Sequence, residues 1–288
     1  MTLRWLPRCV LLAALLGTSG WVALDRDPAD RLPLCDAASG ASHHAPTAPP
    51  SLTDDACRAR PTSIQRVRVV PAPAALAPNP YHHLGATSTA PWSGVLGRIT
   101  VRDPGVRAES LDFTAARFMA RRDGSNGATS WLEAGWAETG WAGGGKQRIY
   151  TYDTNRNAWT FFEDYAISDG DQIWIYLEAG AASGDLESEW LAWLWWGDKW
   201  HLLADQRLPL TSAALVEQYV EVYADAKRAG GYSVPPVAFD NVQVKERPGG
   251  EALFWREDQV PATTRMGTGA YCLNWVTRFD TWSAGDCR

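Results

Sequence analysis

The sequence predicts an all-β protein, most simply a two-sheet antiparallel β-sandwich behind a Pro-rich N-terminal segment. Beyond residue 91 the chain alternates short runs of β-branched and aromatic residues with Gly, Asn, Asp and Ser at the breaks between them. It has no sustained helical period there, and no dinucleotide or phosphate loop. Many short strands joined by close turns are typical of a sandwich.

The N-terminus has the order of a secretory signal. Arg4 and Arg8 come first, an apolar run follows at 9–16, and small residues occupy 17–20. We therefore expect a signal peptide over residues 1–23, a secreted, extracellular protein, and no membrane insertion after cleavage. An uncleaved anchor is the alternative, which the shortness of the apolar run disfavours.

Residues 24–91 are predicted to form a linker or a propeptide. The segment is rich in Pro, Ala, Ser and Asp and has few large apolar side chains. Such a stretch buries too little surface to offset the entropy lost on ordering. His43, His44, His82 and His83 lie in it, and we expect solvated side chains rather than metal ligands.

Residues 92–248 form the predicted sandwich domain. Residues 172–178 alternate strictly, which puts Ile173, Ile175 and Leu177 on the core face of a half-buried strand. Residues 216–223 are predicted as a strand because β-branched and aromatic residues dominate them. The other predicted strands are 131–136, 148–152, 158–162, 190–196, 200–203 and 237–244. Residues 249–288 are predicted as a C-terminal extension with a strand at 253–255 and a disulfide loop.

The cysteines indicate structural disulfides. Loss of Cys9 with the signal leaves an even number in a chain bound for an oxidising compartment. They fall into local pairs, so we expect Cys35–Cys57 and Cys272–Cys287, although other pairings remain open. No pair has the CxxC spacing of a zinc or redox site.

Composition and motifs exclude several classes of function. The net charge of −6 gives no general attraction to phosphate backbones, so we expect no nucleic-acid partner. Gly-x-Ser-x-Gly and His-Glu-x-x-His do not occur, and we expect no metal or cofactor. His201 lies between apolar neighbours within the predicted sandwich and is expected to be structural. The oligomeric state stays open.

Two predicted strands carry glutamates on the face opposite the core. Burying Val216, Val220 and Val222 turns Glu217, Tyr219, Glu221 and Tyr223 to the other face. Burying Leu132, Ala134 and Trp136 turns Glu133 outward, with Gly135 beside it making room for a close backbone. By strand pattern alone, solvated surface glutamates are the simpler interpretation.

Five short words along this part of the chain resemble glutamic peptidases of the eqolisin type and the plant neprosin-like proteins. They are LEAGW at 132–136, the pair Tyr150 and Tyr152, ISDGDQI at 167–173, VEQYVE at 216–221 and VPPVAFDNV at 234–242. The resemblance covers about 113–244 and implies a concanavalin- or glucanase-like sandwich. Glu133 matches the eqolisin Gln, from which it departs, and Glu217 matches the eqolisin Glu. A pair of glutamates is the neprosin-like pattern.

The resemblance implies a secreted acid endopeptidase that acts on polypeptides. Glu217 would deprotonate a water, and protonated Glu133 would donate a hydrogen bond to the developing oxyanion. Activity is expected to peak in acid, because two carboxyls that share a site cannot both ionise cheaply. The residues expected to bind substrate are Trp131, Tyr150, Tyr152, Trp174, Tyr219 and Glu221.

Tryptophan supplies the competing prediction. The chain has 16 of them, and exposed rings on a sandwich can stack on sugars. Trp131, Trp174, Trp193 and Trp195 would form such a platform, so a non-catalytic glycan-binding or surface-interaction module is the alternative. A glycosidase using the same glutamates is a weaker one. Whether the chain is an enzyme therefore depends on whether Glu133 and Glu217 meet.

Overall fold

The computed structural model describes residues 28–42, 44–46, 50, 52, 55–66, 81–123, 127–180, 187–228, 230–266 and 269–287. The predicted signal peptide and His43 lie outside these residues. Among the described residues, no helix has the length and the apolar character needed to cross a membrane.

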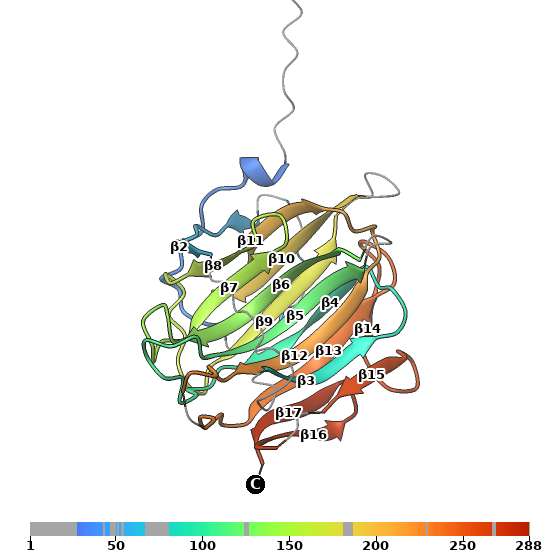
Figure 1. Ribbon diagram of the computed structural model, residues 1–288. Helices are drawn as coiled ribbons and strands as arrows, with labels where there is room; N and C mark the ends of the chain where they lie inside the picture. The colour runs from blue at the N-terminus through green and yellow to red at the C-terminus, as the bar shows by residue number, and fades with distance from the viewer. Residues whose placement is uncertain are drawn as a thin grey trace, which may run out of the picture.

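Two sheets pack face to face in the described chain (Figure 1). Sheet A has the order β1-β11-β10-β9-β4-β13-β17-β16, with β14 also paired to β13. Its strands are β1 (Cys57–Arg58), β4 (Gly94–Thr100), β9 (Gln172–Ala179), β10 (Ser188–Trp196), β11 (Lys199–Leu208), β13 (Val237–Lys245), β14 (Ala252–Phe254), β16 (Tyr271–Thr277) and β17 (Thr281–Asp286). Only β1 and β11 are parallel among its described pairs.

Sheet B has the order β15-β3-β12-β5-β6-β7-β8-β2. Its strands are β2 (Ser63–Gln65), β3 (Tyr81–Ser88), β5 (Phe113–Asp123), β6 (Thr129–Thr139), β7 (Arg148–Asp153), β8 (Ala158–Phe162), β12 (Leu215–Tyr223) and β15 (Ala262–Arg265). One short 3₁₀ helix, η1 (Pro28–Arg31), precedes them. The predicted antiparallel β-sandwich is confirmed.

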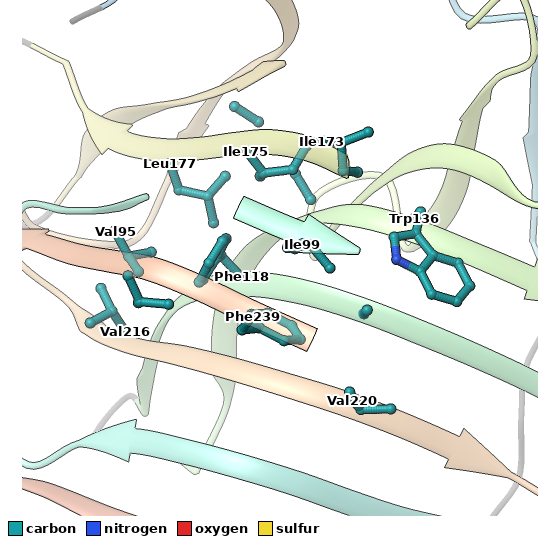
Figure 2. Packing of buried hydrophobic residues seen from close by; sticks show 14 of the residues in the cluster. Val95, Ile99, Phe118, Trp136, Ile173, Ile175, Leu177, Val216, Val220 and Phe239 are labelled. Carbon is teal, nitrogen blue, oxygen red and sulfur yellow. The ribbon is translucent and has the colours of Figure 1, made fainter. Parts of the chain in front are cut away.

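The core lies between the sheets, where strand alternation aims the apolar side chains. Ile173, Ile175 and Leu177 of β9 face Val216 and Val220 of β12 across it, as Figure 2 shows. All of them are almost fully buried. The sides predicted for these two strands are therefore confirmed.

The sandwich begins before residue 92, which corrects the predicted linker boundary. β3 lies within 24–91 but pairs with β12 over seven residue positions, Tyr81 to Thr87. Residues nearer the N-terminus also dock: Cys57 and Arg58 pair with β11, and Ser63–Gln65 pairs with β8. Residues 81–88 contain too few apolar side chains to show the alternation of apolar and polar residues that predicts a strand.

The C-terminal residues complete both sheets instead of forming a separate extension. The strand predicted at 253–255 is present as β14, and β15, β16 and β17 follow it. β17 joins β13 in sheet A, while β15 joins β3 in sheet B. The Cys35–Cys57 and Cys272–Cys287 disulfides are formed as predicted.

Candidate active site

Charged side chains gather on the outer face of sheet B, where three neighbouring strands fix their positions. β5 lies between β12 and β6, and Met119 of β5 is opposite Glu217 on one side and Glu133 on the other. Opposed residues in a sheet point to the same face. The two predicted catalytic glutamates therefore lie on one face, two strand spacings apart, or about 10 Å between Cα atoms.

Arg117 lies in the next outward row, beside Gly135 and Tyr219. A Cβ at Gly135 would come within 2.0 Å of the Ala116 carbonyl oxygen, so only glycine fits there. The room that the sequence predicts at Gly135 is thus confirmed. The missing side chain lets the backbone of Ala116 and Arg117 approach closely.

The guanidinium of Arg117 lies among three carboxyl groups. Its Nε is 3.0 Å from Oε2 of Glu133, and its Nη1 is 3.5 Å from Oε2 of Glu217. Nε also donates to Oε1 of Glu221 at 3.0 Å, and Nη2 makes a second, shorter contact with that oxygen. Arg117 is 2% exposed, so these charges interact with little screening by water.

Glu221 has both carboxyl oxygens occupied. Beyond Arg117, its Oε1 lies 3.2 Å from Nε2 of His83, and its Oε2 accepts from the Tyr81 hydroxyl at 3.2 Å. Burial alone would raise the pKa of Glu221, but the charges of Arg117 and His83 outweigh burial and lower that pKa to about 2. Glu221 is a carboxylate across the ordinary pH range.

Glu217 is held less completely. Its Oε1 is 3.1 Å from Nη1 of Arg121 and accepts from the Thr87 hydroxyl at 3.3 Å. Among the described residues, its Oε2 has only the 3.5 Å contact with Arg117. That oxygen therefore keeps a lone pair for a further hydrogen bond, such as one from water.

Glu133 differs from both. Burial raises the pKa of Glu133 to about 8; the Arg117 charge opposes this rise, and the charges of Glu221 and Glu217 add to it. At neutral pH the group is a protonated acid beside two carboxyls held by arginine. A buried acid next to a carboxylate in a cleft is a frequent mark of acid–base chemistry.

A cavity of about 680 Å³ opens above this cluster. Glu133, Glu221, Arg117, Arg121 and Met119 form part of its floor. Its aromatic walls are Tyr81, Phe113, Trp131, Tyr152 and Trp159, and His83 and Arg66 also line it. The Trp131 and Tyr152 rings stack with centroids 5.6 Å apart.

The structure brings together most, but not all, of the residues predicted to bind substrate. Trp131, Tyr152 and Glu221 line the cavity. Tyr150 and Tyr219 lie on the same face but are fully covered, and neither lines the cavity. Glu217 is 3% exposed and is likewise not among the lining residues. Trp174 is on β9 in the other sheet, so its predicted place in this site is wrong.

The predicted glycan platform is also wrong. Trp174, Trp193 and Trp195 pack in one buried cluster on the outer face of sheet A, beneath Ala29, Leu32 and Ala56. Trp131 lies on sheet B, away from them. Rings buried under the N-terminal segment cannot stack on a sugar.

Sequence reasoning missed the basic residues of the site. Arg117 and Arg121 alternate with Met119 on one side of β5, and Ala116, Phe118 and Ala120 face the core. That alternation is a strand signal that was available in the sequence. His83 had no such signal, and its predicted place in a solvated linker is corrected by β3.

His201 is structural, as predicted. It is fully buried, and its Nδ1 is 2.8 Å from the Tyr165 hydroxyl. Burial lowers the pKa of His201 to about 4, so the ring is neutral. In the described part of the chain, one group of three metal-ligand types comes together, His201 with Cys35 and Cys57. Those cysteines are bonded to each other and offer no thiolate.

Comparison with solved structures finds glutamic peptidases. Two structures of scytalidoglutamic peptidase, one with a peptide-based transition-state analogue and one with a transition-state analogue inhibitor, are each 17% identical to the chain. The match covers 72% of this chain and 98% of theirs, with a TM-score of 0.47. The chain is remotely similar to glutamic peptidases.

A third structure, SCP-B of the eqolisin family in complex with the tripeptide Ala-Ile-His, is 15% identical. It matches over 72% of this chain and 98% of its own length, with a TM-score of 0.45. No protein-family model matches the chain, and a search of curated proteins finds no match. A likeness this remote says nothing about activity.

Proposed function

We propose that the protein is a hydrolase of polypeptides in which Glu133 is the acid and Glu217 the base. The observation that supports it most is Glu133 itself, a buried carboxyl whose pKa is raised by burial to about 8 at the floor of an open cavity. Peptides are the substrate class that the sequence words shared with glutamic peptidases imply.

Occupancy of the oxygens supports Glu217 over Glu221 as the base. Both oxygens of Glu221 are engaged by Arg117, His83 and Tyr81. Glu217 keeps Oε2 for a water. In the proposed reaction Glu217 takes a proton from that water as it attacks the scissile carbonyl, and Glu133 keeps its proton and donates a hydrogen bond to the oxyanion of the tetrahedral intermediate. Glu217 then returns its proton to the departing amine.

Access to Glu217 sets a condition on this reaction. The side chain is 3% exposed and does not line the cavity, whereas its neighbours Met119 and Arg121 do. Substrate binding must therefore move one of these two side chains to admit water. A small side chain movement of this kind is common on binding.

The pKa of Glu133 changes the expected pH range. A general acid must keep its proton, and the raised pKa keeps Glu133 protonated up to about pH 8. Activity should therefore extend from acid to neutral pH and fall above about 8. This is a broader range than the acid optimum that the family resemblance implies.

The test is hydrolysis of a mixture of internally quenched peptides by the full chain and its variants. We expect Glu133→Gln and Glu217→Gln each to lower kcat/KM by about 10²-fold or more. The matched control is Glu138→Gln, since Glu138 is a buried glutamate of the same strand whose side chain faces the other way. Full activity of Glu217→Gln, or an equal loss in Glu138→Gln, contradicts the proposal.

The alternative is a peptide-binding groove without catalysis. The observation that favours it is the ion pair of Glu217 with Arg121, which keeps the base out of the cavity wall. We would expect wild-type protein to bind the quenched peptides under this alternative, but to cleave none of them at any pH between about 4 and about 8.

Export through the predicted signal peptide is also proposed, and the disulfides are compatible with an extracellular protein. We do not propose that all of residues 24–91 are removed as a propeptide, because their removal would take β3, with Tyr81 and His83, away from the site. N-terminal sequencing of the secreted protein decides both points. A mature chain that begins after residue 88 contradicts this assignment of β3 to the site.

A further inference from the structure

We propose that Arg117 is a positioning residue of this reaction: one guanidinium holds Glu217 and Glu221 in place and, by donating to Glu221 instead of Glu133, leaves Glu133 as the proton-bearing acid. The inference rests on the proposed function and adds to it the residue that assigns the roles.

The position of Arg117 is central to the cluster. β5 is the middle strand of the three, so a side chain that rises from it reaches β12 on one side and β6 on the other. Its guanidinium approaches Glu133 and Glu217 at 3.0 and 3.5 Å. At 3% side-chain exposure it is as buried as the carboxyls it contacts. A buried cation that contacts three carboxyl groups at once holds them at fixed spacing.

The single hydrogen on Nε of Arg117 distinguishes Glu221 from Glu133. Nε of Arg117 carries a single hydrogen and lies 3.0 Å from both Oε1 of Glu221 and Oε2 of Glu133. The hydrogen points to Glu221, which also receives Nη2. Glu133 therefore has the charge of Arg117 nearby but no hydrogen bond from Nε, and a carboxyl without such a donor keeps its own proton more readily.

The groups around Arg117 come from each packed element. β3 contributes His83 and Tyr81, β12 contributes Glu217, Tyr219 and Glu221, β6 contributes Glu133, β7 contributes Tyr150, and β5 itself contributes Arg121. The Tyr219 ring lies 5.5 Å from the guanidinium carbon. The negative charges of Glu217 and Glu221 are nearly balanced by the positive charges of Arg117 and Arg121. Loss of Arg117 therefore leaves an excess of negative charge.

Removal of the charge should therefore move protons onto the carboxyls. Arg117→Met takes away a charge that lowers the pKa of Glu221, so the pKa of Glu221 rises. Protonation of Glu221 changes the charge beside Glu217, and the acid limb of the kcat/KM profile moves to higher pH. Arg117→Lys keeps the charge but loses the planar fork, so the limb stays while kcat falls.

The experiment joins a titration to a rate profile, both on the full chain. Carboxyl resonances of protein labelled with ¹³C at the Glu side chains are followed against pH in wild type, Arg117→Met and Arg117→Lys, and Glu133→Gln assigns the resonance of the acid. The matched control is Arg148→Met, which removes another buried arginine on a neighbouring strand that is not among the residues lining the cavity.

We expect Arg117→Met to raise the pKa of Glu221, and the pH of the acid limb of the kcat/KM profile, by about one unit or more. We expect Arg117→Lys to keep both within a few tenths of a unit and to lower kcat about tenfold, and Arg148→Met to change neither. The Arg117→Lys variant keeps the test decisive even where Arg117→Met fails to fold. Wild-type kcat in Arg117→Lys, or the same shift in Arg148→Met, overturns the inference.

The two proposals fail in different ways. A wild-type protein that cleaves no peptide, but whose carboxyl titrations respond to Arg117→Met as expected, refutes the hydrolase and with it the role in a reaction. An active enzyme that depends on Glu133 and Glu217, but whose titrations ignore Arg117, refutes the positioning role alone.

Discussion

The outer faces of the two sheets both carry aromatic rings, but only one of the faces is covered by another part of the chain. On sheet A, Trp174, Trp193 and Trp195 turn outward and are buried beneath residues of the segment 28–56. On sheet B, Glu133 and Glu217 turn outward, and Glu133 lines an open cavity. Both faces follow from the same two-residue alternation, whose other side fills the common core.

The difference lies in what covers each face. The Cys35–Cys57 disulfide and the pairing of β1 with β11 hold the N-terminal segment on sheet A. The Trp195 indole donates to the His44 carbonyl at 3.0 Å, which adds a polar contact to the apolar ones. The aromatic rings on sheet A are covered, whereas on sheet B aromatic rings and charged side chains together line an open cavity. Chemistry is therefore to be sought on sheet B.

The largest expected effect is on the covered face. Trp193→Ala removes a fully buried ring of the outer cluster of sheet A, and we expect it to lower the free energy of unfolding by about 4 kcal/mol. Activity per folded molecule should not change, since Trp193 is not among the residues lining the cavity. Denaturant unfolding and peptide hydrolysis measure the two quantities.

The matched variant on the open face is Trp131→Ala. Trp131 is half-buried and stacks on Tyr152 at the cavity wall. We expect a loss of about 1 kcal/mol in stability and a severalfold rise in KM. If Trp131→Ala destabilises the fold as much as Trp193→Ala does, the contrast between a covered and an open face is wrong.

An intermediate effect is expected in the pH dependence of stability. The pKa of Glu133 is raised by burial from 4.5 to about 8, so the folded protein binds more protons than the unfolded chain between these values. The contribution of Glu133 to stability is therefore fully present below about pH 4.5 and is lost as pH rises through about 8. Glu133→Gln should reduce this fall, by on the order of 2 kcal/mol.

Thermal unfolding at several pH values checks this expectation. Glu163→Gln is the control, because Glu163 is 35% exposed and pairs with Lys146 and Arg148 away from the cavity. The control should keep the wild-type pH dependence. An unchanged fall in Glu133→Gln would mean that Glu133 ionises easily and is not the buried acid of the open face.

The smallest expected effect concerns Thr87. Its hydroxyl donates to Oε1 of Glu217 and lies 2.7 Å from the Tyr219 hydroxyl. Thr87→Val keeps the shape and removes both contacts, so we expect a loss of about 1 kcal/mol in stability. We also expect a severalfold lower kcat, because Glu217 is held less firmly. Thr263→Val, at the cross-strand neighbour on β15, should leave kcat unchanged.

Much of the sandwich was predictable because alternation is a local property. The sides of β6, β9 and β12 follow from their own residues, and so does the outward direction of Glu133 and Glu217. The disulfides follow from local spacing. β3 was not predictable, because its polar sequence is stabilised as a strand by pairing with β12 and β15.

The sequence by itself determined the fold class and which side of each strand the glutamates take, and it favoured the cysteine pairs that the structure contains. Only the tertiary structure decided that Arg117 lies between the glutamates, that His83 joins them, and that the tryptophans of sheet A are covered. The physical reason is the distance along the chain over which each interaction acts. Alternation acts between adjacent residues, whereas strand order, register and the docking of a distant segment depend on contacts between parts of the chain that lie far apart in sequence.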